Sequence, residues 1–114
     1  MLTHEVPVLP SVATSSEVMA VLESGLDSMK FIPAGSAGGP SYLPAIGAPI
    51  PYVQFCPACG ISLANAPEYL RLPNVSCVGG SWLTPTAVVE AKDWSKIISL
   101  ARQATALSNK WSES

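Results

Sequence analysis

The chain has 114 residues, of which 48% are hydrophobic and 12% are charged, and its formal net charge is −2. Such an apolar chain is not disordered, and it is long enough for one domain, residues 1–114, with a single core. Its six basic residues are scattered, which excludes the footprint of a nucleic-acid-binding protein. No apolar run could span a membrane and no secretory signal opens the chain, so we expect a soluble cytoplasmic protein.

Four short apolar runs recur along the sequence and predict β-strands. Their centres lie about 23 residues apart, a spacing typical of strand–helix units in a parallel sheet. The runs are Val6–Leu9, Met29–Ile32, Tyr52–Cys56 and Val75–Val78.

The segments between these runs carry helix signals. Thr14-Ser15-Ser16-Glu17 is a capping box that opens a helix, which we expect to end at Gly25. A second short helix opens at Gly39-Pro40 and is disturbed by Pro44, and a third fits Asn65–Leu72.

The C-terminal part predicts a helix start at Thr84-Pro85 and then the longest helix, capped by Asp93 and running roughly over Trp94–Asn109. Trp94 and Trp111 are interpreted as packing residues. The helix has an apolar stripe of helical period, made of Trp94, Ile97, Ile98, Ala101, Ala104 and Leu107. The whole pattern is an α/β fold of four consecutive βα units. Eight such units close a TIM (β/α)8 barrel of about 250 residues, so the chain predicts half of one.

Lys30 is the only lysine or arginine in the first 70 positions, and it lies inside the second predicted strand. An ammonium group on a buried strand is costly unless it is paired or neutral. One interpretation is an amine nucleophile that forms a Schiff base with a carbonyl substrate. The other is a lysine whose stem lies along apolar surface while its head reaches water. Taken alone, this stretch favours the second interpretation.

Small residues follow the third and fourth predicted strands, Ala58-Cys59-Gly60 and Gly79-Gly80-Ser81. Parallel α/β folds place ligands at the carboxyl ends of strands, and barrel phosphate sites usually lie on the last two. Backbone N–H groups in such turns can hold an anion, although glycine can also serve a tight turn alone. Together with Lys30, these loops predict a lysine aldolase that acts on an anionic keto acid. No carboxylate in the sequence is placed as its general base.

Cys56-Pro57-Ala58-Cys59 is a C-x-x-C motif, which leaves a redox pair or half of a zinc site as further interpretations. The only other zinc ligands would be Cys77 and His4, so zinc is disfavoured and no metal is expected. The motif does not open a long helix after a first strand, which makes the redox pair the minority hypothesis.

Three blocks of the sequence, in this order and at this spacing, resemble the 2-keto-3-deoxy-6-phosphogluconate (KDPG) aldolases. That family also contains the 4-hydroxy-2-oxoglutarate (KHG) aldolases. The blocks are Met29–Ala34, Phe55–Ser62 and Leu72–Leu83. The resemblance extends from Val6 to Leu107 and is to the C-terminal half of the family's barrel.

The resemblance implies a class I aldolase in which Lys30 is the Schiff-base lysine and no cofactor is needed. It places Ala58, Cys59, Gly60, Gly79, Gly80 and Ser81 in the loops around the substrate phosphate. Cleavage would give pyruvate and glyceraldehyde 3-phosphate, as in the Entner–Doudoroff pathway of carbohydrate metabolism, or pyruvate and glyoxylate from the KHG substrate. The expected partners are a small-molecule 2-keto acid and either further copies, since the family is typically trimeric, or a complementary half-barrel.

The sequence also departs from the family pattern. The family's phosphate loop usually reads Cys-Pro-Thr-Gly-Gly, and Ala58 and Cys59 stand in place of its threonine and first glycine. We therefore expect weakened phosphate binding. Gly35 stands where the family often has a glutamate. The match also lacks the first four strands of the family's barrel. By resemblance, those strands would supply the catalytic glutamate and the arginine and threonine that bind the pyruvate carboxylate.

Three hypotheses follow from this pattern. The chain is an aldolase half that is inactive alone, or it is completed by a second copy or by a separate half. The third hypothesis is a redox or scaffold remnant that uses Cys56 and Cys59.

Overall fold

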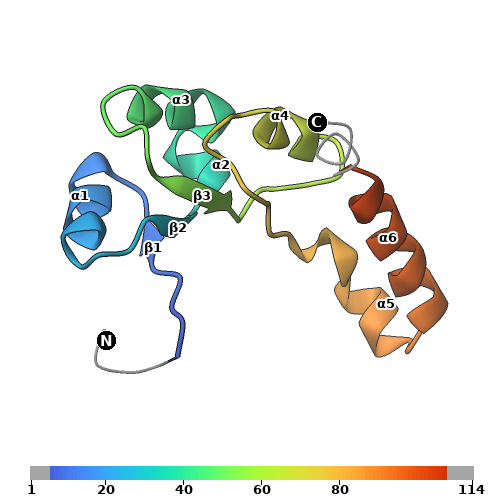
Figure 1. Cartoon of the computed structure of the whole chain (residues 1–114). Helices are drawn as coiled ribbons and strands as arrows, with labels where there is room; N and C mark the ends of the chain where they lie inside the picture. The colour runs from blue at the N-terminus through green and yellow to red at the C-terminus, as the bar shows by residue number, and fades with distance from the viewer. Residues whose placement is uncertain (1–5, 108–114) are drawn as a thin grey trace.

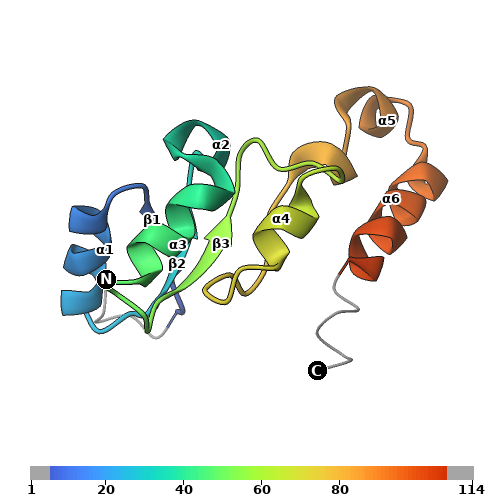
Figure 2. The same cartoon turned by 90° about the horizontal axis from the view of Figure 1, so that it is seen from above.

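The structure is a computed structural model that describes residues 6–107, and its centre is a three-stranded parallel sheet in the order β1-β2-β3. Figure 1 shows helices α1 to α4 gathered over one face of this sheet. In Figure 2 the same helices follow one another across the sheet, and α5 and α6 lie beyond α4 at one end of the molecule. The strands are β1 (Ser11–Val12), β2 (Ser28–Phe31) and β3 (Gln54–Pro57).

Short helices connect the strands and complete the chain. The α-helices are α1 (Ser15–Glu23), α2 (Ala34–Ala37), α3 (Tyr42–Gly47), α4 (Ala66–Leu70), α5 (Thr86–Glu90) and α6 (Trp94–Ala106). Two 3-10 turns, η1 (Gly39–Ser41) and η2 (Ser81–Leu83), precede α3 and α5. Within residues 6–107, no helix has the length and apolar character needed to cross a membrane.

The capping box predicted for α1 is confirmed. The Thr14 hydroxyl accepts a hydrogen bond from the Glu17 N–H at 3.3 Å, and the Glu17 carboxylate accepts one from the Thr14 N–H at 3.0 Å. Hydrogen bonds from the Ala13 N–H and from Thr14 lower the pKa of Glu17, because they stabilise the charged carboxylate. The helix ends at Glu23, and Gly25 follows with a φ of 90°, in the region that favours glycine.

The first predicted strand, Val6–Leu9, is wrong in position. Val6 is 71% exposed and Leu9 is 48% exposed, and the strand lies at Ser11–Val12 instead. Proline has no N–H to donate to a ladder, so pairing begins where the Pro10 carbonyl accepts from the Lys30 N–H at 2.8 Å.

The fourth predicted strand, Val75–Val78, is also wrong as a strand, because only an isolated parallel bridge joins Phe55 to Val75. The segment still runs along the edge of β3. The Phe55 N–H donates to the Asn74 carbonyl at 2.8 Å, and the Ser76 N–H donates to the Phe55 carbonyl at 3.1 Å. The described residues therefore hold three strands and one extended edge segment rather than four strands.

Several predicted helix bounds also shift. Pro44 does not disturb the second helix, because it lies in the first turn of α3, where an N–H has no partner within the helix. The third helix is shorter than predicted, Ala66–Leu70.

The longest helix, α6, packs mainly against η2 and α5. Trp94 is 56% exposed, so its predicted packing role is wrong. Trp111 and Asn109 lie outside the described residues. The half-buried side of α6 consists of Ile97, Leu100 and Ala104, and Leu107, just after the helix, is also half-buried.

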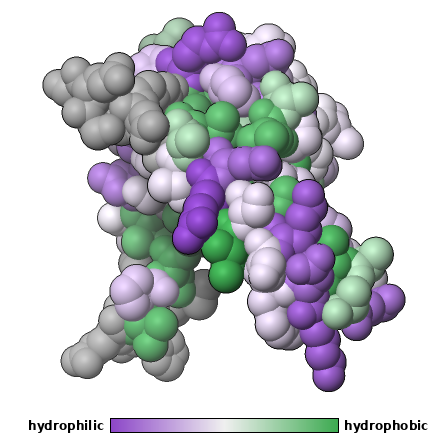
Figure 3. Space-filling view, turned by 90° about the vertical axis from the view of Figure 1, so that its right-hand side faces the viewer, coloured by the Kyte–Doolittle hydropathy of each residue, from purple (hydrophilic) through white to green (hydrophobic). Residues whose placement is uncertain are grey.

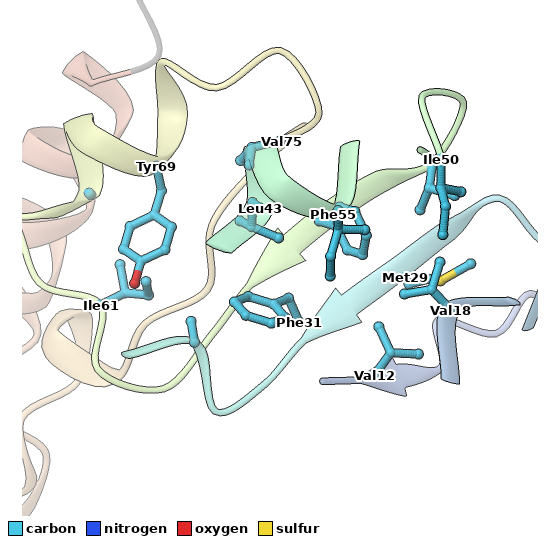
Figure 4. Packing of buried hydrophobic residues seen from close by; sticks show 14 residues of the cluster. Val12, Val18, Met29, Phe31, Leu43, Ile50, Phe55, Ile61, Tyr69 and Val75 are labelled. Atoms are coloured by element: carbon cyan, nitrogen blue, oxygen red, sulfur yellow. The ribbon is translucent and has the colours of Figure 1, made fainter. Parts of the chain in front are cut away.

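The core lies between the sheet and helices α1 to α4 (Figure 4). Met29 and Phe31 on β2 are fully buried, and their neighbours in register on β3 are Phe55 and Pro57. The Phe31 ring stacks on Tyr42 with ring centroids 5.6 Å apart and meets the edge of Phe55 at 6.3 Å. This packing fixes which face of the sheet is inside, and hence which side chains are left on the other face.

Loss of the α1 cap is expected to destabilise the fold. Thr14→Ala removes the acceptor for the Glu17 N–H and should lower the free energy of unfolding by about 1 kcal/mol in urea denaturation. Ser16→Ala is the matched control, since it changes an exposed residue of the same turn outside the capping box. Equal stability of the Thr14→Ala variant and the wild type would contradict a stabilising role for the box.

Candidate active site

Lys30 lies on the face of the sheet opposite the core. Its neighbours in the strand, Met29 and Phe31, are buried, whereas Lys30 itself is half-buried. Successive side chains of a strand point to opposite faces, so the Lys30 side chain emerges on the face that α1 to α4 do not cover. Within residues 6–107 its ammonium group has no hydrogen-bond or salt-bridge partner. This half-buried position fits both interpretations of Lys30, as an amine nucleophile and as a lysine whose head reaches water.

The loops after β2, after β3 and after the edge segment are joined by backbone hydrogen bonds. The Ala34 N–H donates to the Ala58 carbonyl at 2.8 Å, and the Gly35 N–H donates to the Cys59 carbonyl at 3.2 Å. On the other side, the Gly79 N–H donates to the Pro57 carbonyl at 2.9 Å. The ladder of the sheet thus continues into the loops at its carboxyl edge.

The loop after β3 contains a left-handed turn. Cys59 has a φ of 71° and Gly60 has a φ of 82°, which is ordinary for glycine but costly for cysteine. Asn65 braces this turn, because its side-chain amide donates to the Gly60 carbonyl at 2.8 Å and its side-chain oxygen accepts from the Ser62 N–H at 2.7 Å. We predicted Asn65 only as a helix start. The Ser62-x-x-Asn65 spacing indicates this role, because at that spacing each polar side chain can bond the backbone N–H of the other residue.

One cavity of about 280 Å³ brings together every residue predicted for the site. Its lining is Lys30, Ala58, Cys59, Gly60, Ile61, Gly79, Gly80 and Ser81. Ile61 is the one lining residue that the sequence did not single out. The N–H groups of Cys59, Gly60 and Gly80 have no hydrogen-bond partner within residues 6–107. They are therefore available donors near a lysine amine, which is a geometry that suits an anionic carbonyl compound.

The Trp82 ring packs directly against Gly80. A side-chain carbon at this position would lie 1.8 Å from the Trp82 ring, so the ring could not keep its place against the backbone. The close approach of Trp82 explains a glycine here independently of any ligand. The Trp82 ring also packs against the Gly79–Ser81 loop, which forms one wall of the cavity.

None of the carboxylates in the described part of the chain lines the cavity with Lys30. Glu17, the clearest case, is exposed and bound within its capping box. Within residues 6–107, the cavity therefore contains no carboxylate that could act as a base. Nor do these residues contain a cluster of three or more histidine, cysteine or acidic side chains that could hold a metal ion.

Cys56 has Cys77 as its thiol neighbour rather than Cys59. Cys56 pairs in register with Lys30 and is half-buried on the same face, whereas Cys59 lies in the left-handed turn. Burial and the adjacent Cys77 thiol raise the pKa of Cys56 from 9.0 to about 11, an effect that the nearby Lys30 charge partly offsets. No observation in the described residues favours a Cys56–Cys59 pair.

Comparison with known proteins identifies the family. The family model for KDPG and KHG aldolase matches residues 1–100. The chain belongs to the KDPG and KHG aldolase family. It is 47% identical over 103 residues to the 2-dehydro-3-deoxy-phosphogluconate aldolase of Pseudomonas aeruginosa, which covers 90% of this chain and 47% of the relative. It is 46% identical over 99 residues to the KHG/KDPG aldolase of Escherichia coli K12, covering 87% and 46%. The chain thus spans about half the length of the curated relatives it matches.

Solved aldolase structures agree with the fold. The KDPG aldolase of Legionella pneumophila, captured with pyruvate as a covalent carbinolamine intermediate, superposes with a TM-score of 0.89 at 45% identity. The match covers 90% of this chain and 50% of that one. The Zymomonas mobilis ZM4 KDPG aldolase with 3-phosphoglycerate gives 0.83 at 38% identity, covering 93% and 49%. These neighbours are TIM-barrel aldolases, and the three-stranded parallel α/β unit is consistent with half of such a barrel.

The raised pKa of Cys56 predicts a loss of stability at alkaline pH. Between pH 9 and about 11 the unfolded chain gives up the Cys56 proton while the folded chain keeps it, so the free energy of unfolding should fall across this window. Urea denaturation under reducing conditions should show a steeper fall for the wild type than for Cys56→Ser, which lacks the thiol. Parallel pH profiles for the two proteins would contradict the shift.

Proposed function

We propose that this chain carries the Schiff-base half of a class I aldolase, with Lys30 as its nucleophile. The observation that supports the proposal is the single cavity that Lys30 shares with the loops after β3 and after the edge segment. A lysine on the uncovered face, close to unpartnered backbone donors, has both the exposure and the anion-binding surroundings that a keto acid requires.

The proposed reaction begins when the neutral Lys30 amine attacks the keto carbon of the substrate to form a carbinolamine. Loss of water gives an iminium ion, which accepts the electron pair released when the neighbouring carbon–carbon bond breaks. A base takes the proton of the substrate hydroxyl group, and the aldehyde product departs. The remaining enamine is protonated and hydrolysed, which releases pyruvate and restores the amine.

The proposed primary substrate is a 2-keto-3-deoxy-6-phosphogluconate-like acid, which would give pyruvate and glyceraldehyde 3-phosphate. Gly60, Gly79, Gly80 and Ser81 would surround its phosphate, with Ala58 and Cys59 in the same loops. The N–H of Gly79 is already bonded to Pro57, so the donors would be those of Cys59, Gly60 and Gly80.

A second candidate substrate is 4-hydroxy-2-oxoglutarate, which would give pyruvate and glyoxylate. The loop after β3 favours it, because Ala58 offers no hydroxyl donor and Cys59 brings a side chain into the left-handed turn. Both features weaken a phosphate site and leave the Lys30 end of the cavity unchanged.

We also propose that turnover needs four further βα units that complete the barrel. In Figure 3 the molecule is hollowed below its helical layer, and hydrophobic residues line the hollow. Leu9, 48% exposed, lies on this uncovered side beside Cys56 and Cys77. A complementary half-barrel would cover the face, pair the edges of the sheet and supply the base that the Lys30 cavity lacks. By family resemblance, the completed barrel would assemble as a trimer.

The role of Lys30 can be tested by trapping an imine. Incubation with pyruvate and cyanoborohydride should place a reduced pyruvate adduct on Lys30, which would also block tryptic cleavage after that residue. Lys30→Met should lose this adduct, and Lys96→Met, which removes an exposed lysine of α6, should keep it. Peptide mass analysis distinguishes the sites. An adduct spread equally over the remaining lysines would overturn the assignment.

The need for a second half can be tested by mixing. The chain alone should show no aldolase turnover, whereas addition of the N-terminal half of a full-length relative should produce pyruvate in a coupled assay. Lys30→Met in this chain should abolish the turnover of the mixture, and the added half alone provides the background rate. Full turnover by the isolated chain would refute the proposed requirement. Stable association of the two halves, seen by sedimentation, without turnover would contradict the proposal that this chain supplies the Schiff-base half.

A further inference from the structure

The edge segment beside β3 contains one extra residue, and this places two cysteines on the same face. Regular parallel pairing after the Phe55–Val75 bridge would bring the Val78 N–H to the Pro57 carbonyl. The donor is instead the Gly79 N–H, at 2.9 Å. The segment between Val75 and Gly79 is therefore bulged, with one residue more than the stretch of β3 it accompanies.

The bulge turns both Ser76 and Cys77 toward the uncovered face. The Ser76 hydroxyl donates to the side-chain oxygen of Gln54 at 2.9 Å, and Gln54 is two positions before Cys56 on β3. Cys77 is exposed and lies beside the Cys56 thiol. Cys56, Cys77, Gln54 and Ser76 together line a cavity of about 210 Å³ that is separate from the one lined by Lys30 and the loops.

The two thiols differ in exposure. In a disulfide exchange, one cysteine attacks the reagent first, and a second, resolving cysteine then attacks the mixed disulfide. In this chain without a complementary half, Cys77 is exposed and can meet a reagent from solution, whereas Cys56 is half-buried. The pKa of Cys56, raised to about 11, keeps it protonated at neutral pH. A dissolved oxidant would therefore react first at Cys77.

We propose that Cys56 and Cys77 are a site of reversible thiol–disulfide exchange with small-molecule disulfides, for which oxidised glutathione is the probe. The Cys77 thiolate attacks one sulfur of the reagent, which forms a mixed disulfide and releases one glutathione thiolate. Cys56 then gives up its proton and attacks the Cys77 sulfur, and the second glutathione thiolate leaves. Two protein thiols are oxidised to one disulfide, and one glutathione disulfide is reduced to two thiols.

The disulfide would act on the shape of the neighbouring cavity. Cys56 lies two residues before Ala58, and Cys77 lies two residues before Gly79, so each cysteine is close to one wall of the cavity that contains Lys30. A covalent link between them would fix the spacing of those walls. The chemistry of the thiols themselves does not depend on the aldolase reaction.

The test uses the whole chain, oxidised glutathione and tryptic peptide mapping without reduction. Cleavage after Lys30, Arg71 and Lys92 puts Cys56 and Cys59 in peptide 31–71 and Cys77 in peptide 72–92. The expected product joins the two peptides, is two hydrogen atoms lighter than their sum, and separates on addition of dithiothreitol. Cys59→Ser should still give this product in full, whereas Cys77→Ser and Cys56→Ser should lose it.

Three results would overturn the proposal. They are loss of the joined peptides in Cys59→Ser, a disulfide confined to peptide 31–71, and glutathione adducts that never proceed to a cross-link. Circular dichroism of each variant shows that it is folded. Because serine and cysteine have nearly the same size, at least one of the two cross-link variants should pass this check.

Discussion

The two-residue alternation of β2 against β3 is the constraint on which the rest of the structure depends. Met29 and Phe31 are fully buried against the helices, and the register sets Met29 beside Phe55 and Lys30 beside Cys56. A slip of one residue would bury the lysine and expose two large apolar side chains, at a cost of several kcal/mol. The register of this four-residue strand therefore determines both the stability of the core and the exposure of the lysine.

The sequence was sufficient to predict the residues that meet at the cavity. Lys30 was conspicuous as an isolated cation in an apolar run, and the small residues after the next two apolar runs follow a rule for parallel sheets. The carboxyl ends of neighbouring parallel strands lie at one edge, so spacing along the chain becomes proximity in space. The chemical roles of these residues rest on family resemblance and stay predictions.

The sequence was less informative where pairing, rather than hydrophobicity, decides the structure. Val6–Leu9 is apolar, yet Pro7 within it and Pro10 directly after it cannot donate to a ladder, so the short strand β1 begins after Pro10. Val75–Val78 has the composition of a strand, but the bulge leaves it with a single bridge. Bulges depend on which N–H reaches which carbonyl, and hydrophobic periodicity does not record this. The same limit explains why the C-x-x-C motif drew attention to Cys59, although Cys77 is the neighbour of Cys56.

The hydrogen bonds that extend the sheet into its loops have a wider consequence. The turn that contains Cys59 is held by its own carbonyl groups, bonded to Gly35 and to the Asn65 side chain, and not by the side chain of Cys59. The side chain at position 59 thus takes no part in holding the turn, although the φ of 71° there favours glycine. A side-chain replacement at this position changes the lining of the cavity without removing the hydrogen bonds that hold the turn. The departure of Ala58 and Cys59 from the usual loop sequence is a change that this backbone can absorb.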